Sequence, residues 1–97
     1  MEQVTPPKVK LLTSGNHLMA KQMQAEAGDL LPKHLANMES ILFIQEGACI
    51  LTINDEDKLL KQGDAFVIPP EIKHQIRAKT HFKGIHFMPN DIKFQFF

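Results

Sequence analysis

Apolar residues recur at every second position in short runs along this chain, and that period constrains its fold more than any other feature. No window of helical length carries apolar residues at the three-and-four spacing of a helix face. Because successive side chains of a strand point to opposite faces, the period predicts an all-β protein. The expected strands cover residues 9–12, 17–25, 40–45, 48–54, 58–60, 65–68, 74–78, 83–87 and 92–96.

Turn-forming residues separate these runs. Glycine supplies a positive φ in Glu46-Gly47 and in Gln62-Gly63-Asp64, and proline presets the turn at Pro69-Pro70. The short connections suit antiparallel strands that follow one another closely.

Several of the expected strands are apolar on both faces. Ile41 and Phe43 alternate with Leu42 and Ile44 on one of them. The second face must therefore be covered by another sheet layer or by another subunit. The C-terminal run places Ile92, Phe94 and Phe96 on one side of a strand, and this stripe is expected either to pack on its own barrel or to dock at a dimer interface.

With 97 residues, of which 43% are hydrophobic, the chain is predicted to form a single domain with a filled core. We divide it into an N-terminal arm or strand at 1–15, a barrel at 16–90 and a C-terminal strand at 91–97. Eleven basic residues balance eleven acidic ones, so no net charge attracts nucleic acid or an anionic membrane surface. A neutral chain also favours self-association, and we expect a homodimer.

The single cysteine, Cys49, lies mid-strand and is interpreted as a small core thiol. The N-terminal residues lack the basic and apolar regions of a signal peptide, and no apolar run approaches the roughly 20 residues that cross a bilayer. A cytoplasmic location is the expectation. Nucleophile elbows, phosphate-binding glycine loops and zinc-type cysteine pairs are not found, so no catalytic residue is assigned.

Two segments share the spacing of a known pair of motifs. They are GDLLPKHLANMESILFIQEG, from Gly28 to Gly47, and GDAFVIPPEIKHQIRA, from Gly63 to Ala78. Their frames resemble the cupin motifs G-x5-H-x-H-x3-E-x6-G and G-x5-P-x-G-x2-H-x3-N. The resemblance implies a jelly-roll β-barrel of two antiparallel sheets. It does not fix a function, because cupins include enzymes, sensor domains and storage proteins.

In metal-binding cupins, two histidines and a glutamate of the first motif and the histidine of the second hold the ion. The matching positions here are His34, Ala36, Ser40 and His74. Two imidazoles alone are too few donors for a firmly held zinc or iron ion. A divalent transition metal (Zn, Ni, Mn or Fe) would need a third ligand.

Two side chains are candidates for that third ligand. Glu39 would serve if it reached inward, but strand alternation points it outward if Ser40 points inward. His86 would serve if its face of the last barrel strand turns inward, and His17 is a weaker candidate. The second motif also departs from the family pattern, because Glu71 replaces a glycine and Ala78 replaces an asparagine.

Three functions remain open. The interpretation we favour is a non-enzymatic cupin that binds a small molecule in an apolar barrel pocket without a tightly held metal. Its expected pocket residues are His34, Ser40, Leu42, Ile44, His74, Ile76 and His86. The alternatives are a metal-dependent isomerase or dioxygenase that uses His34 and His74, and a structural module that dimerises or docks through its C-terminal phenylalanines.

Overall fold

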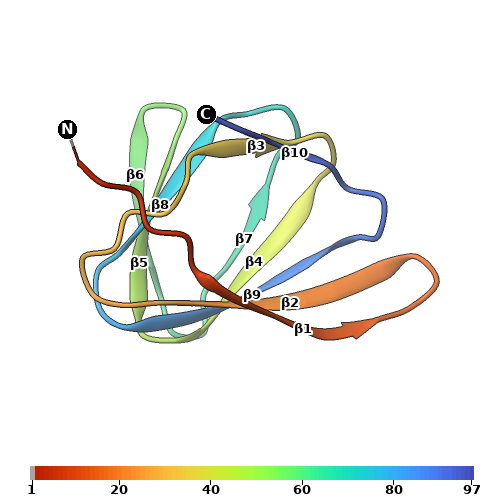
Figure 1. Ribbon diagram of the computed structural model, residues 1–97, viewed down its shortest axis with the longest axis horizontal. Coiled ribbons are helices and arrows are strands. Elements are labelled where there is room, and N and C mark those ends of the chain that lie inside the picture. The colour runs from red at the N-terminus through yellow and green to blue at the C-terminus, as the bar shows by residue number, and fades with distance from the viewer. Residues whose placement is uncertain (1) are drawn as a thin grey trace.

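The computed structural model describes residues 2–97 and confirms the all-β prediction: two antiparallel sheets of five strands each enclose a common interior (Figure 1). The first sheet has the order β1 (Lys8–Ser14), β2 (Leu18–Ala25), β9 (Phe82–Pro89), β4 (Ser40–Glu46) and β7 (Ala65–Ile68). The second has the order β10 (Phe94–Phe96), β3 (His34–Ala36), β8 (His74–Ala78), β5 (Ala48–Ile53) and β6 (Glu56–Lys61).

Each expected strand has a counterpart whose ends lie within two residues of the expected ones, but β3 was not predicted. This strand has only three residues, which is too short for a period-2 alternation to be recognised in the sequence. It forms because β10 pairs along all of it and His34 pairs with His74 of β8. Tertiary pairing, rather than local preference, therefore creates the strand that carries His34.

Two connections show why turn chemistry succeeds here. Asn54 and Asp55 adopt φ values of 54° and 60° between the paired residues Ile53 and Glu56, as a two-residue hairpin turn requires. Gly47 has a φ of 76°, and a Cβ there would lie 2.1 Å from the carbonyl oxygen of His81. Gly47 is thus required both by its conformation and by a close approach of the backbone.

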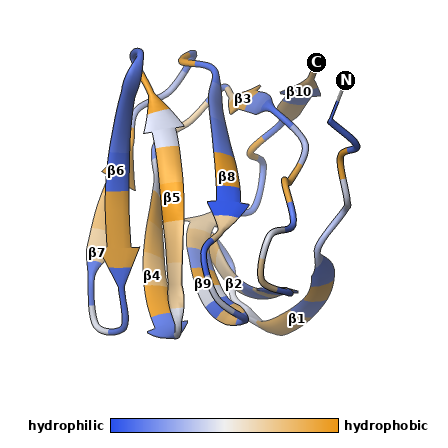
Figure 2. Cartoon of the chain, turned by 90° about the vertical axis from the view of Figure 1, so that its left-hand side faces the viewer, coloured by the Kyte–Doolittle hydropathy of each residue, from blue (hydrophilic) through white to orange (hydrophobic). Residues whose placement is uncertain are grey.

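The core lies between the sheets, where alternation places one side of each strand. Leu42 and Ile44 of β4 meet Leu51 of β5, and all three are fully buried. Figure 2 shows β4 and β5 as largely hydrophobic along their lengths. The second apolar face of β4 points away from this core.

That outer face of the first sheet exposes a row of apolar side chains. Ile41 pairs with Val67 on one side and with Phe87 on the other, and each is between 42% and 49% exposed. The other sheet of the same chain does not cover this face. The homodimer expected from the sequence stays a prediction.

Both ends of the chain lie against the second sheet. In the N-terminal arm, Glu2 forms a bidentate ion pair with Arg77 of β8, and the amide of Thr5 donates to the carbonyl of Leu30 at 2.8 Å. At the other end, β10 pairs with β3, and the Phe97 amide donates to the Lys33 carbonyl at 3.0 Å. Within residues 2–97, no helix is long and apolar enough to cross a lipid bilayer.

Candidate functional site

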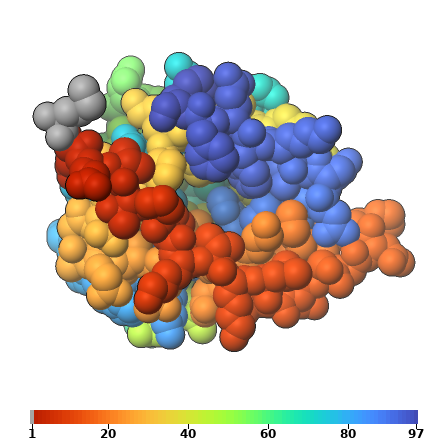
Figure 3. Space-filling model, viewed as in Figure 1, coloured from red at the N-terminus to blue at the C-terminus, as the bar shows by residue number. Residues whose placement is uncertain are grey.

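A cavity of about 350 Å³ opens at one end of the barrel. Its mouth lies between the N-terminal arm and the C-terminal strand, where Figure 3 shows a hollow between the red and dark blue segments. Its walls are mainly apolar, from Pro6, Pro7, Val9, Met23, Leu31, Pro32, Ile76, Met88, Phe94 and Phe96, and its polar lining residues are Lys21, Gln22, His34 and His86.

Three histidines from both sheets gather at this end of the interior. His34 of β3 and His74 of β8 are register partners in the second sheet, and their ring centroids lie 4.4 Å apart in an edge-to-face arrangement. His86 comes from β9 of the first sheet and is buried on the inward face. Strand pairing therefore brings His74 to His34, which lies 40 positions earlier in the sequence. Closure of the two sheets adds His86, 12 positions after His74.

Backbone carbonyls orient two of these rings. The Nδ1 of His34 lies 3.2 Å from the carbonyl oxygen of Pro32, and the Nδ1 of His74 lies 3.0 Å from that of Ile72. Because a carbonyl only accepts, each Nδ1 carries the proton, and each neutral ring presents Nε2 as an acceptor. The Nε2 of His86 lies 3.4 Å from the hydroxyl of Ser40, which gives that buried hydroxyl a partner.

Burial keeps the three imidazoles neutral. Desolvation lowers the pKa of His34 and the pKa of His74, although the hydrogen bonds to Pro32 and Ile72 oppose the shift. Burial, and after it the nearby His34 and His74, lowers the pKa of His86 to about 4. Near neutral pH the cluster is an uncharged set of hydrogen-bonding groups in an apolar wall.

The aromatic residues of the C-terminal strand form part of that wall. The ring centroid of His34 lies 5.4 Å from that of Phe94 and 5.2 Å from that of Phe96. These rings restrict the orientation of His34 from the side of the mouth.

The structure divides the pocket residues expected from the sequence. His34, Ile76 and His86 line the cavity. Ser40 and His74 are buried and contact two of these residues from behind, through the hydrogen bond to His86 and the ring contact with His34.

The other candidates lie outside the cavity. Leu42 and Ile44 belong to the packed core. Glu39 is exposed beside the buried Ser40, and His17 is exposed in the connection between β1 and β2.

Lys21 lines the cavity, yet the sequence patterns did not single it out. On β2 it stands between Met19 and Met23 on one face of an alternating strand, directly across from His86 of β9. The sequence signal that could have identified Lys21 is its position between two methionines on one face of a strand. Whether that face points into the barrel is decided only by the pairing with β9.

The donor set does not fit a firmly held metal ion. Among residues 2–97, no group of three or more His, Cys, Asp or Glu side chains is arranged to hold one. Ala36 and Ser40, which stand at two ligand positions of the motif, are both buried, and the exposed Glu39 supplies no carboxylate in their place. Two imidazoles with free Nε2 atoms fall short of the ligand sets that zinc and non-haem iron require.

The turn before His74 survives the loss of the motif glycine. Glu71 takes a φ of 65°, the left-handed conformation that glycine adopts at low cost, and its amide donates to the carbonyl of Ala36 at 2.7 Å. At the other altered position, Ala78 is buried in the core. The frame of the second motif thus persists although these two residues differ from the family pattern.

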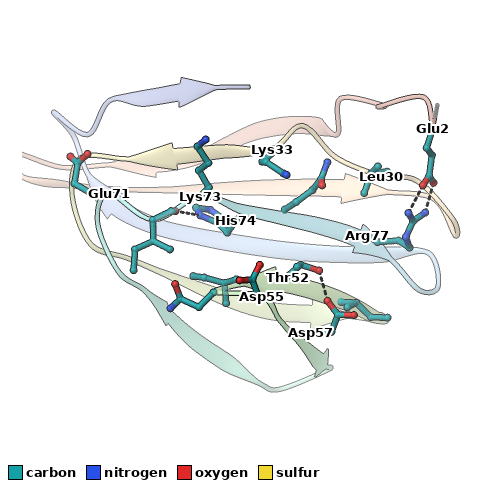
Figure 4. Close-up of a pocket in the computed structure, with 15 residues that line it drawn as sticks. Glu2, Leu30, Lys33, Thr52, Asp55, Asp57, Glu71, Lys73, His74 and Arg77 are labelled. Carbon is teal, nitrogen blue, oxygen red and sulfur yellow. Dashed lines mark hydrogen bonds and ion pairs between the residues drawn. The ribbon is translucent and has the colours of Figure 1, made fainter.

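A second, wider groove of about 860 Å³ lies along β5 and β8 (Figure 4). Its lining mixes charges of both signs, and several are already satisfied: Glu2 pairs with Arg77, and the hydroxyl of Thr52 donates to Asp57 at 2.6 Å. His74 borders this groove, but its side chain is buried beside His34. Because acidic and basic side chains both line it, the groove presents no single sign of charge to a ligand.

Comparison with known proteins identifies the family. A family model described as a cupin domain matches residues 21–86, which is more than half of the chain. The chain belongs to the cupin superfamily. This match includes both motif segments, from Gly28 to Ala78, and extends through His86, so the resemblance inferred from the sequence is confirmed at the level of the family.

Solved structures share the fold of this cupin. A cupin superfamily protein from Desulfitobacterium hafniense has a TM-score of 0.80 and 16% identity, covering 94% of this chain and 84% of its own. A conserved protein of unknown function from Streptococcus pyogenes has a TM-score of 0.76 and 20% identity, covering 91% and 76%.

A variant of salicylate 1,2-dioxygenase from Pseudoaminobacter salicylatoxidans has a TM-score of 0.81 and 19% identity. The match covers 93% of this chain but only 30% of the dioxygenase chain. At this identity, the likeness shows the fold alone. No curated protein sequence matches the chain.

Proposed function

We propose that this cupin binds a small organic molecule in the cavity at the open end of the barrel, without a tightly held catalytic metal. The observation that carries the proposal is the cavity itself: about 350 Å³, apolar walls and a few convergent polar groups. Small-molecule sites commonly combine these features, at volumes from roughly 300 Å³ upward.

The neutral histidines provide hydrogen-bonding groups for a ligand. His34 faces the cavity with Nε2 as an acceptor, and His86 hydrogen-bonds with Ser40 beneath it. Such groups orient a ligand by hydrogen bonds while the apolar wall supplies most of the contact area.

A metal-dependent reaction, such as that of an isomerase or a dioxygenase, is the second candidate. One observation favours it: the Nδ1 atoms of His34 and His74 both donate to backbone carbonyls. A histidine that binds a metal through one ring nitrogen usually donates a hydrogen bond from the other in this way. It requires a further ligand, because the described side chains supply no third donor in place.

Binding of neutral probes tests the first candidate. Isothermal titration calorimetry with benzamide, 4-methylpentanamide and 3-phenylpropanamide should show saturable binding of at least one. The Met23→Trp variant, which places an indole in the cavity wall, should abolish that binding. The matched Ile41→Trp variant, on the exposed outer face of β4, should leave it unchanged. Equal binding by the Met23→Trp variant and the wild type would reject the cavity as the site.

Metal content separates the two candidates. Protein purified without chelator should contain only substoichiometric transition metal, and incubation with Zn, Ni, Mn or Fe(II) should not raise it. One equivalent of metal, lost in the double variant His34→Ala/His74→Ala, would instead support the metal-dependent reaction.

A further inference from the structure

Lys21 gives the cavity a formal charge that the rest of its lining does not balance. Within residues 2–97, the lining contains no aspartate or glutamate, and burial lowers the pKa of both lining histidines. The ion pairs of the described residues involve Lys58, Arg77, His81 and Lys83, and none of them includes Lys21. The cavity therefore carries a positive charge.

Strand register places Lys21 on the face of β2 that lines the cavity. Lys21 lies opposite His86 on β9 and opposite Leu11 on β1. Its neighbours on the same face, Met19 and Met23, lie opposite Met88 and Gly84, which are buried. Lys21 itself is partly buried, and it lines the cavity.

Among residues 2–97, no acidic side chain forms an ion pair with Lys21, which stands among mainly apolar lining residues. A partly buried charge is costly unless an opposite charge and hydrogen bonds satisfy it. A ligand with a carboxylate would supply both. A cationic ligand would instead meet Lys21 with no acidic group to offset the repulsion.

We propose that the occupant of this cavity is a small organic carboxylate. Its carboxylate pairs with Lys21, and its apolar body lies against Met23, Ile76 and the rings of Phe94 and Phe96. This assignment rests on the proposed function, because both concern the same cavity. An inorganic anion would leave the apolar wall unused, so the organic part of the ligand is an essential part of the proposal.

Matched acids and amides test the charge separately from the shape. Benzoate, 4-methylpentanoate and 3-phenylpropanoate have the shapes of the three amides above but carry a negative charge at neutral pH. For the pair that fits best, the acid should bind about tenfold more tightly than the amide, because a hydrogen bond to a charged group contributes more than a neutral one.

Variants of Lys21 assign that preference to its charge. Lys21→Met keeps the length and apolar stem, so the acid should lose about tenfold in affinity while the amide keeps its affinity. Lys21→Arg should retain the preference. Lys10→Met is the matched control, because Lys10 lies on the adjacent strand β1, is exposed, and is not among the residues that line the cavity. It should change neither affinity.

The outcomes separate the two proposals. If acid and amide bind equally, or if the acid preference persists in Lys21→Met, then Lys21 merely extends into solvent and the carboxylate assignment is wrong, while the small-molecule site stands. If neither acid nor amide binds, both proposals fail. A loss of acid binding in Lys10→Met equal to that in Lys21→Met would show a general surface effect and would also overturn the assignment.

Discussion

The barrel interior has a closed end and an open end, and the same strands build both. At the closed end, Leu42, Ile44, Leu51 and Phe82 are fully buried and pack in one cluster. At the open end, the inward positions of the same sheets carry Lys21, His34, Ser40, His74 and His86 around the cavity. Strand β4 shows the change within a few residues, since Ser40 begins it and Leu42 and Ile44 follow on the same face.

The difference shows how alternation serves two purposes. Alternation decides which side chains point inward. The identity of those side chains then decides whether they fill the core or border a cavity. The closed end stabilises the fold by burying apolar area. The open end keeps polar groups and space in the interior, which costs stability and leaves room for a ligand.

Shortening one side chain at each end should give unequal losses of stability. Leu42→Ala is expected to lower the free energy of unfolding by about 4 kcal/mol, because it leaves a new void in a fully packed core. Met23→Ala should cost only about 1 kcal/mol, because Met23 is half-buried at the wall of an existing cavity. Urea unfolding followed by circular dichroism measures both. Similar losses would mean that the open end packs as tightly as the closed end.

Lowering the pH should destabilise the protein through the buried histidines at the open end. The pKa of His86 is lowered from 6.5 to about 4, so below pH 6.5 the unfolded chain takes up a proton that the folded chain does not. The free energy of unfolding is therefore highest above the unfolded value and falls as the pH decreases toward 4. The full shift corresponds to roughly 3 kcal/mol, and lowered pKa values of His34 and His74 act in the same direction.

Thermal melts at a series of pH values, with a chelator present, measure this dependence. His86→Gln should flatten it between pH 6.5 and pH 4. His17→Gln, at an exposed position, should leave it unchanged. An unchanged pH dependence in His86→Gln would show that His86 is not the source.

A smaller effect is expected at the turn that leads into His74. Glu71→Gly should raise the free energy of unfolding by about 1 kcal/mol, because glycine adopts the observed φ of 65° without the steric cost that glutamate carries. Glu71→Ala removes the same carboxylate but retains the strain, so it should not stabilise the protein. Equal changes in the two variants would trace the effect to the charge and not to the backbone.

The sequence patterns predicted most of the fold but little of the cavity lining, since of the expected pocket residues only His34, Ile76 and His86 line the cavity. Period-2 runs located the strands on which Leu42, Ile76 and His86 lie, because alternation is a local property. They did not locate β3, whose three residues become a strand through pairing with β10 and β8. They also counted Leu42 and Ile44 as pocket residues, since an inward position alone does not separate a packed core from a cavity wall.

Local sequence established that the chain is all-β, which residues alternate, and that His34 and His74 keep the frame of the cupin motifs while Ala36 and Ser40 do not. Strand order and sheet closure established the rest: His86 meets Ser40 from another strand, and Lys21 lines a cavity to which residues 2–97 contribute no carboxylate. The physical reason is that alternation depends on neighbours along the chain. The surroundings of a charge depend on side chains brought together from strands far apart in it.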